Sequence, residues 1–290
     1  MIFSQLIVNS IIIGSIYALV ASGFSLIYAT NKYMHFAHGV AIALAAYIVY
    51  FLSLHISFPI ACILTILLSG CFGVAMHRCI YLPLQKRGAS TVILLIASIA
   101  MLIFFENLIQ LIFGADVKTI RILEVTRGID FFGAVVTPLQ FIIVLVSLII
   151  FAALFMFMKF TVLGRNMRAV ADNKELASIV GINHARVADY SFFIGSCLAG
   201  VAGILIGMEQ NLTPLMGTML IIRGFTGAVV GAVEVVAGAI VGSYILGFAE
   251  NFGVWYLPSG YKDAIAFILL FIFLLFKPHG IFGIEKGVKK

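Results

Sequence analysis

The chain is a succession of long apolar segments separated by short polar stretches. Most of the segments reach the roughly 20 residues that a helix needs to cross about 30 Å of hydrocarbon. None shows the alternation of polar and apolar residues that a membrane β-strand requires. The pattern predicts an all-α fold, a polytopic transmembrane helical bundle of about eight spans, forming a single domain over residues 1–290. The apolar segments cover approximately 3–29, 37–56, 58–80, 91–113, 138–158, 189–209, 218–250 and 262–277.

The seventh segment, 218–250, is too long and too rich in glycine for one straight helix. An acidic residue, Glu234, lies near its middle. A helix break inside a membrane is tolerated only where protein or a water-filled cavity covers the freed backbone groups, and such breaks are frequent near the substrate path of transporters. We therefore expect a broken or re-entrant glycine-rich segment at 218–250 and take Glu234 as a candidate for a translocation path.

Charged residues are scarce, and many of the basic ones gather in the loop 159–186. The 290 residues are 63% hydrophobic and 10% charged, a composition that excludes a water-soluble domain. The net charge of +6 is therefore a topology signal rather than a sign of nucleic-acid binding. If the basic ends face the cytoplasm, the N-terminus is periplasmic and the C-terminus cytoplasmic, provided that 218–250 is broken. The residues placed inside are Lys32, Arg78, Lys86, Arg87, Lys159, Arg165, Arg168, Lys174, Arg186, Lys277, Lys286, Lys289 and Lys290.

A short capped helix is predicted within the charged loop, from Asn173 to Val180. Asp172 is suited to the N-cap position and Glu175, three residues later, to the reciprocal position of a capping box. Gly181 stands where a helix-terminating glycine is expected. The side chains of Leu176, Ile179 and Val180 share one face. Because so short a helix is marginal alone in water, this face packs either into a groove of a partner protein or onto the chain's own bundle.

At this loop the sequence resembles the coupling loop of ABC-importer permeases. Glu175, Ala177 and Gly181 keep the spacing of the permease signature E-A-A-x-x-x-G, with Leu176 in place of the central alanine. The resemblance extends over nearly the whole chain and is to the branched-chain amino acid (LIV-type) permease family, specifically its H-type subunit. The further matching blocks are Phe36-Ala37-His38-Gly39, Leu198-Ala199-Gly200-Val201-Ala202-Gly203, Tyr261-Lys262-Asp263-Ala264-Ile265-Ala266-Phe267 and Lys277-Pro278-His279-Gly280-Ile281-Phe282-Gly283.

Two positions depart from the family pattern. His35 stands where the family usually has asparagine before Phe-Ala-His-Gly. The stretch from Gly231 to Gly238 falls where the family tends to read Gly-Gly-x-Gly-Ser-x-Pro-Gly, so this chain loses the Gly-Ser-x-Pro turn and gains Glu234. The second change concerns the local geometry of this segment and, with it, the identity of the solute.

The resemblance implies a membrane-spanning permease subunit of an importer in the bacterial cytoplasmic membrane. Its substrate would be a small polar solute, by default branched-chain or other amino acids. It would assemble with a second related permease, two ABC ATPase subunits and an extracytoplasmic solute-binding protein. Residues 159–188 would form the cytoplasmic coupling loop, and the ATPase-coupling residues would be Glu175, Leu176, Ala177, Ile179, Val180 and Gly181.

The motifs of ATP binding and of hydrolysis are missing from the sequence. It contains no phosphate-binding G-x-x-x-x-G-K-[ST], so nucleotide would be bound by partner ATPases and this chain needs no cofactor of its own. It also lacks G-x-S-x-G and H-E-x-x-H, and we expect a transport protein rather than an enzyme, with no catalytic residues.

Ionisable residues inside the apolar segments are the remaining candidates for function, because such groups are costly at membrane depth. Glu106 is suited either to a translocation path or to a helix-packing hydrogen bond. The alternative function for the chain is an ion-coupled secondary transporter, in which Glu106 would be the coupling group. His35 and His38 have no acidic or cysteine neighbour and predict no metal site. His38, Glu106 and Glu234 are thus the candidate path residues. Glu209 and Glu250 lie near span ends, where we expect interfacial solvation.

Overall fold

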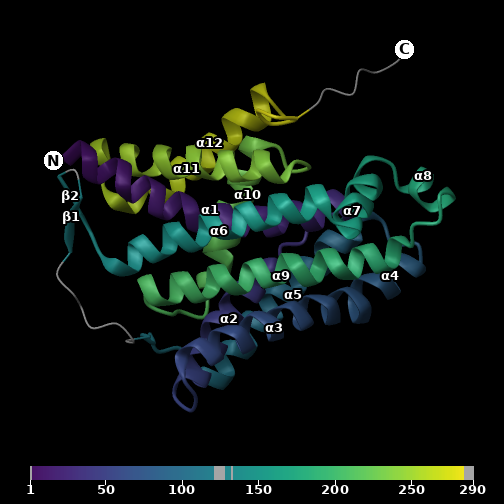
Figure 1. Ribbon diagram of the computed structural model, residues 1–290, viewed down its shortest axis with the longest axis horizontal. Coiled ribbons are helices and arrows are strands. Elements are labelled where there is room, and N and C mark those ends of the chain that lie inside the picture. Colours follow the sequence, from purple (N-terminus) through teal and green to yellow (C-terminus); the bar gives the residue numbers. More distant parts are fainter. Residues whose placement is uncertain (1, 121–127, 132, 284–290) are drawn as a thin grey trace.

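The computed structural model describes residues 2–120, 128–131 and 133–283, and within them the chain is a bundle of helices with one small hairpin (Figure 1). The long helices are α1 (Ile2–Asn31), α3 (Phe58–Met76), α5 (Thr91–Phe113), α6 (Pro138–Phe160), α9 (His184–Glu209) and α11 (Val236–Tyr256). The shorter ones are α2 (His38–Ser53), α4 (Leu82–Lys86), α7 (Val162–Asp172), α8 (Lys174–Ile179), α10 (Met216–Gly231) and α12 (Lys262–Phe276). A π-helical turn, His77–Tyr81, joins α3 to α4, and a 3-10 turn, Ser259–Tyr261, precedes α12. The hairpin consists of the antiparallel strands β1 (Ile129–Phe131) and β2 (Ala134–Val136).

Several helices begin at capping residues that local sequence supplies. The Ser90 hydroxyl accepts the Ile93 N–H at the start of α5. At the start of α6, Thr137 and Gln140 form a reciprocal capping box with Pro138 in the first turn. Such caps satisfy N–H groups that have no partner inside the helix, so they set where each helix starts.

The predicted all-α membrane bundle is confirmed, whereas the prediction of about eight spans is not. Among the described residues, five helices are long and apolar enough to cross a membrane, or up to six if the bent pair α10–α11 counts as one span. The difference arises because α2 and α10, with 16 residues each, and α12, with 15, are short for a full crossing.

The predicted break in the glycine-rich segment is present between α10 and α11. The chain bends by 114° between the two helices, across residues 232–235. Neighbouring groups bind the backbone that the break leaves free: Ser25 Oγ donates to the Val233 carbonyl at 2.7 Å, and the Ile281 and Phe282 N–H groups donate to the Val230 and Gly231 carbonyls. The segment after α12 therefore stabilises the end of α10, which meets the requirement for broken helices in membranes.

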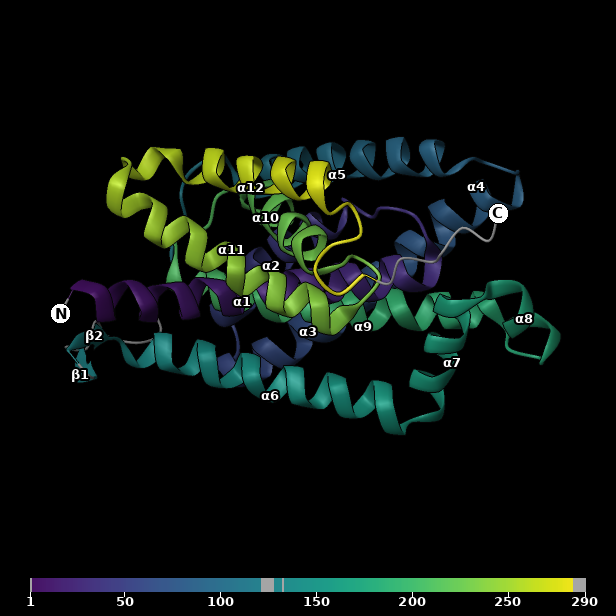
Figure 2. The same ribbon diagram turned by 90° about the horizontal axis from the view of Figure 1, so that it is seen from above.

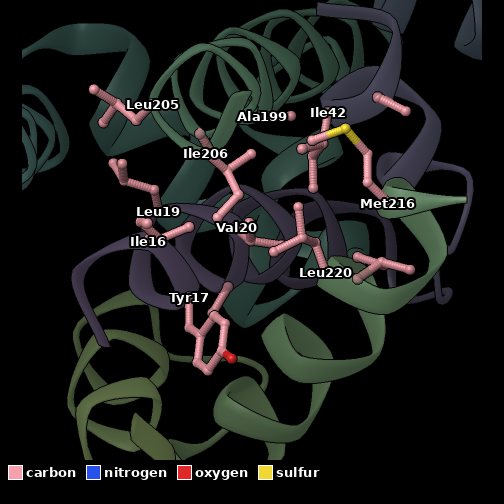
Figure 3. Close-up of a cluster of buried hydrophobic side chains, with 14 of the residues drawn as sticks. Ile16, Tyr17, Leu19, Val20, Ile42, Ala199, Leu205, Ile206, Met216 and Leu220 are labelled. Carbon is pink, nitrogen blue, oxygen red and sulfur yellow. The ribbon is translucent and has the colours of Figure 1, made fainter. Parts of the chain in front are cut away.

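The core surrounds α1 and α9, and α6 lies at the periphery. In the most apolar window of each helix, 89% of the residues of α1 and 72% of those of α9 are buried, against 17% for α6. Figure 3 shows Ile16, Val20 and Leu205 in the buried cluster between these central helices. The helices α1 and α9 run in opposite directions, as do α5 and α12 (Figure 2).

Two short helices meet inside this core. Gly39, in the first turn of α2, lies so close to α10 that a Cβ there would be 2.6 Å from the Gly217 carbonyl oxygen. A Cβ on Gly217 would in turn meet the Gly39 carbonyl. Small residues at such a crossing allow close approach of backbones within a membrane, and here they bring the N-terminal ends of α2 and α10 together.

Candidate functional site

Helices α4, α7 and α8 lie at one end of the molecule, and the N-terminus and the β hairpin lie at the other (Figures 1 and 2). Lys32 follows the end of α1 and Lys86 ends α4 at this same end, as the charge pattern predicted. The C-terminal residues Lys286, Lys289 and Lys290 lie outside the described residues. We call the end with α7 and α8 the basic end.

Helix α8 is shorter than predicted, and its cap is a different residue. It spans Lys174–Ile179, and Asn173 rather than Asp172 is the N-cap: the Asn173 Oδ1 atom accepts the N–H groups of Glu175 and Leu176, both at 3.0 Å. The predicted capping box is therefore wrong. Its physical reason is that α7 continues through Asp172, so this residue is already helical and the chain first turns out of the helix at Asn173.

Gly181 ends α8 in the way that the sequence predicted. Its φ angle is +84°, a left-handed conformation that glycine adopts without steric cost. Its N–H donates to the Ser178 carbonyl at 3.1 Å, and the Ile182 N–H donates to the Ala177 carbonyl at 3.0 Å. This pair of bonds is a Schellman motif, which ends the helix and returns the chain toward α9.

The two sides of α8 have different environments. Ala177 is buried in a cluster with Met167 of α7 and Val187 of α9. Leu176, Ile179 and Val180 are 61%, 79% and 74% exposed, and we call these three side chains the α8 stripe. We considered that this face packs either into a partner protein or onto the chain's own bundle. The structure shows that it does not pack onto the bundle. The small helix is anchored by its alanine and presents its apolar stripe outward, beyond the ends of the long helices.

Glu106, in α5, forms hydrogen bonds with the start of α10. Its Oε1 atom accepts the Thr218 backbone N–H at 3.0 Å and the Thr218 hydroxyl at 2.6 Å. Thr218 is the third residue of α10, so the carboxylate lies at the positive end of that helix dipole. Glu106 is only 5% exposed. Of the two roles considered for it, a translocation path or a helix-packing hydrogen bond, the structure shows the hydrogen bond.

His38 and Glu106 lie near the junction of α2 and α10, and Glu234 lies elsewhere. His38 is the first residue of α2, is fully buried, and precedes the Gly39 that touches Gly217. Glu234 lies in the break at the far end of α10, is half exposed, and pairs with Lys32 at 3.0 Å. The three candidate path residues therefore do not form one site.

The histidines form no metal site within the described part of the chain. The His35 Nδ1 atom is 2.7 Å from the Tyr81 hydroxyl, and the ring centroids of His35 and His38 are 6.0 Å apart. Over residues 2–120, 128–131 and 133–283, no group of three or more His, Cys, Asp or Glu side chains is placed to hold a metal ion.

A partly buried charged network that the sequence did not predict joins four helices. Arg223 of α10 donates through Nη1 to the Tyr17 hydroxyl at 3.0 Å and through Nη2 to Asp263 Oδ1 at 2.7 Å. The Tyr17 hydroxyl donates to Glu250 Oε2 at 2.8 Å, and Arg223 Nε lies 3.8 Å from Glu250 Oε1. Glu250 is 0% exposed, so its assignment to a solvated span end is wrong. The available signal was Arg223, the one arginine in the apolar segment 218–250. Glu209 accepts a hydrogen bond from Gln140 at 2.9 Å.

Comparison with known proteins places the chain in a family. A family described as branched-chain amino acid transport system / permease component matches residues 6–274. The high-affinity branched-chain amino acid transport system permease proteins BraD of Pseudomonas aeruginosa and LivH of Escherichia coli are each 33% identical, over 97% of this chain and 96% of theirs. The probable branched-chain amino acid transport permease LivH of Methanocaldococcus jannaschii is 29% identical over 96% of this chain and 91% of its own.

A solved structure with the same fold supports the assignment of the architecture. PsaBC from Streptococcus pneumoniae, in complex with Fab, matches with a TM-score of 0.52 and 16% identity, over 93% of this chain and 91% of that chain. At this identity the match concerns the fold alone. The family match and the relatives at 33% identity, which extend over almost the whole chain, lead to one conclusion: the chain belongs to the family of branched-chain amino acid transport system permease components.

Proposed function

We propose that this permease is the membrane-spanning subunit of a bacterial ABC importer for branched-chain and related amino acids. The observation that carries the proposal is the α8 stripe, because three apolar side chains on a capped helix lie uncovered at the basic end. Helix-in-groove binding uses this arrangement of apolar side chains. Two ATPase subunits would bind residues 159–188 from the cytoplasm. A second related permease and an extracytoplasmic binding protein would complete the importer.

The contacts of α8 supply a route by which ATPase movement reaches the bundle. The cluster that holds Ala177 also contains Leu26 of α1, Met167 and Val170 of α7, and Val187 of α9. A displacement of α8 is therefore passed to α1 and α9, the two most buried long helices. Because packed cores resist compression, a push on the α8 stripe would shift these helices rather than be absorbed locally.

The proposal is tested by reconstituting the permease with its cognate ATPases and binding protein in proteoliposomes. We expect leucine uptake that requires the binding protein outside and hydrolysable ATP at the ATPase side, and that persists when ion gradients are collapsed. Replacing ATP by a non-hydrolysable analogue is the matched control. Uptake by the permease alone, driven by a proton or sodium gradient, would contradict the proposal.

The alternative is an ion-coupled secondary transporter that uses Glu106. Two variants at this position distinguish it from the proposed ATP-driven importer. Since Glu106 accepts two hydrogen bonds from Thr218, we expect Glu106→Gln to keep an acceptor oxygen and most of the uptake. Glu106→Leu leaves the partly buried Thr218 donors without this acceptor and should lower the free energy of unfolding by about 1–3 kcal/mol. Uptake and detergent stability are measured for both variants. Full stability with no uptake in Glu106→Gln would instead favour ion coupling.

A further inference from the structure

A narrow apolar crevice of 270 Å³ lies among α1, α6, α7 and the start of α11, near the basic end. Its lining includes Leu26, Leu154, Phe155 and Ile240, together with the exposed Arg168. Pockets that enclose drug-sized ligands measure about 300–1,000 Å³. The crevice therefore has room for part of one extended hydrocarbon chain, but not for a bulky ligand.

The crevice is next to the face of the bundle that is most suited to contact lipid. Helix α6, which forms one wall, is the most apolar of the candidate spans, and only 17% of its most apolar window is buried. Phe155, on the crevice wall, is 60% exposed, and the adjacent Met156 is 58% exposed. In a bilayer these side chains face acyl chains, so hydrocarbon is the material that meets the crevice.

Two basic side chains lie together where this wall ends. The Lys159 ammonium lies 5.7 Å from the ring centroid of Phe155 and 5.4 Å from that of Phe160. A lysine that lays its stem on aromatic rings and extends its charge outward is typical of a membrane–water interface. Arg168 donates through Nη2 to the Lys159 carbonyl at 3.5 Å, which places the guanidinium beside the same boundary.

Within the described part of the chain, no acidic side chain neutralises the charge of Lys159 or Arg168. Glu234 also lines the crevice, but its carboxylate pairs with Lys32 at 3.0 Å. Over the described ranges, no carboxylate lies within ion-pair distance of Lys159 or Arg168. An apolar crevice thus opens at a pair of cations that have no acidic partner in the described part of the chain.

We propose that this crevice binds one anionic phospholipid from the leaflet at the basic end. An acyl chain would occupy the space between α1, α6 and α11, and the phosphate would lie against Arg168 and Lys159. Basic pockets between membrane helices are suited to phosphate head groups, and guanidinium binds phosphate with charge-assisted hydrogen bonds. The lipid would connect α6 and α7 to the central helix α1, and so hold the segment that leads to α8 against the bundle.

The test uses the full-length permease, extracted in mild detergent from membranes that contain phosphatidylglycerol and phosphatidylethanolamine, and washed extensively. Native mass spectrometry counts the phospholipid that each protein retains. We expect one phosphatidylglycerol on the unmodified protein and about fivefold less retention in Arg168→Gln, the effect of one basic side chain near an anionic head group. Leu154→Trp, which fills the crevice but keeps both cations, should also lose the lipid.

Arg186→Gln is the matched control, because it removes the same charge from an exposed residue at the basic end that does not line the crevice. It should retain the lipid fully. Equal retention in Arg168→Gln and Arg186→Gln would overturn the proposal, as would equal loss in both. Equal retention of phosphatidylethanolamine and phosphatidylglycerol by the unmodified protein would also overturn it. The readout does not involve uptake, so the result is independent of the transported solute.

Discussion

Ile179→Asp is expected to abolish ATP-driven uptake while leaving the permease folded. The Ile179 side chain is 79% exposed and contributes little buried surface to the bundle, so an aspartate there stays in water when the chain is alone. When an ATPase groove covers the α8 stripe, however, the same carboxylate must lose its hydration without a partner. Replacing an apolar residue at the centre of a contact costs about 2–4 kcal/mol, which weakens ATPase binding on the order of 100-fold.

The measurements for this variant are ATPase copurification, leucine uptake and the detergent unfolding temperature of the permease. Val117→Asp is the matched control, since Val117 is 57% exposed and lies after α5 at the end opposite α8. We expect the control to keep the ATPases and to transport normally. If Ile179→Asp retained both ATPases and full uptake, the α8 stripe would not be the docking surface.

The features that could be predicted from sequence are those determined by neighbouring residues. A run such as 218–250, with glycines throughout and Glu234 inside, cannot stay one straight helix in hydrocarbon, and the structure bends it at 232–235. Gly181 was predictable for the same reason, because the positive φ that ends α8 favours glycine. In both cases the residues that predict the end of the helix lie within a few positions of it.

The wrong predictions involve choices that the local sequence does not decide. Asp172 and Asn173 are both good capping residues, and only the extent of α7 selects Asn173. The helices α2 and α10, at 16 residues each too short for a full crossing, depend on burial among other helices, which the apolar pattern alone does not reveal. Glu250 was misassigned because its partner Tyr17 is 233 positions away in the sequence. Such pairings follow from tertiary packing.

Arg223→Met is expected to cause the largest loss of stability of any single change considered for this chain. The substitution keeps an apolar stem of similar length but removes the cation that lies among Tyr17, Glu250 and Asp263. Glu250 is fully buried, so its carboxylate would be left as an uncompensated charge in the core. Breaking a buried pair in this way costs about 3–5 kcal/mol. The measurement is the free energy of unfolding by SDS titration in mixed micelles.

A second change in the same network separates the loss of charge balance from the loss of packing. In Arg223→Met with Glu250→Gln, the buried carboxylate is neutral and the Tyr17 hydroxyl still has an amide oxygen to bind, so most of the lost stability should return. Arg78→Met is the matched control, because Arg78 pairs with Asp189 at the same 2.7 Å but is 63% exposed. Exposed pairs contribute little, so this variant should unfold almost as the unmodified protein does.

Equal destabilisation by Arg78→Met and Arg223→Met, or no recovery in the double variant, would show that the buried network does not depend on charge compensation. Recovery would show instead that Arg223 stabilises the bundle chiefly by neutralising Glu250, and that the hydrogen bond between α1 and α11 can persist without the ion pair.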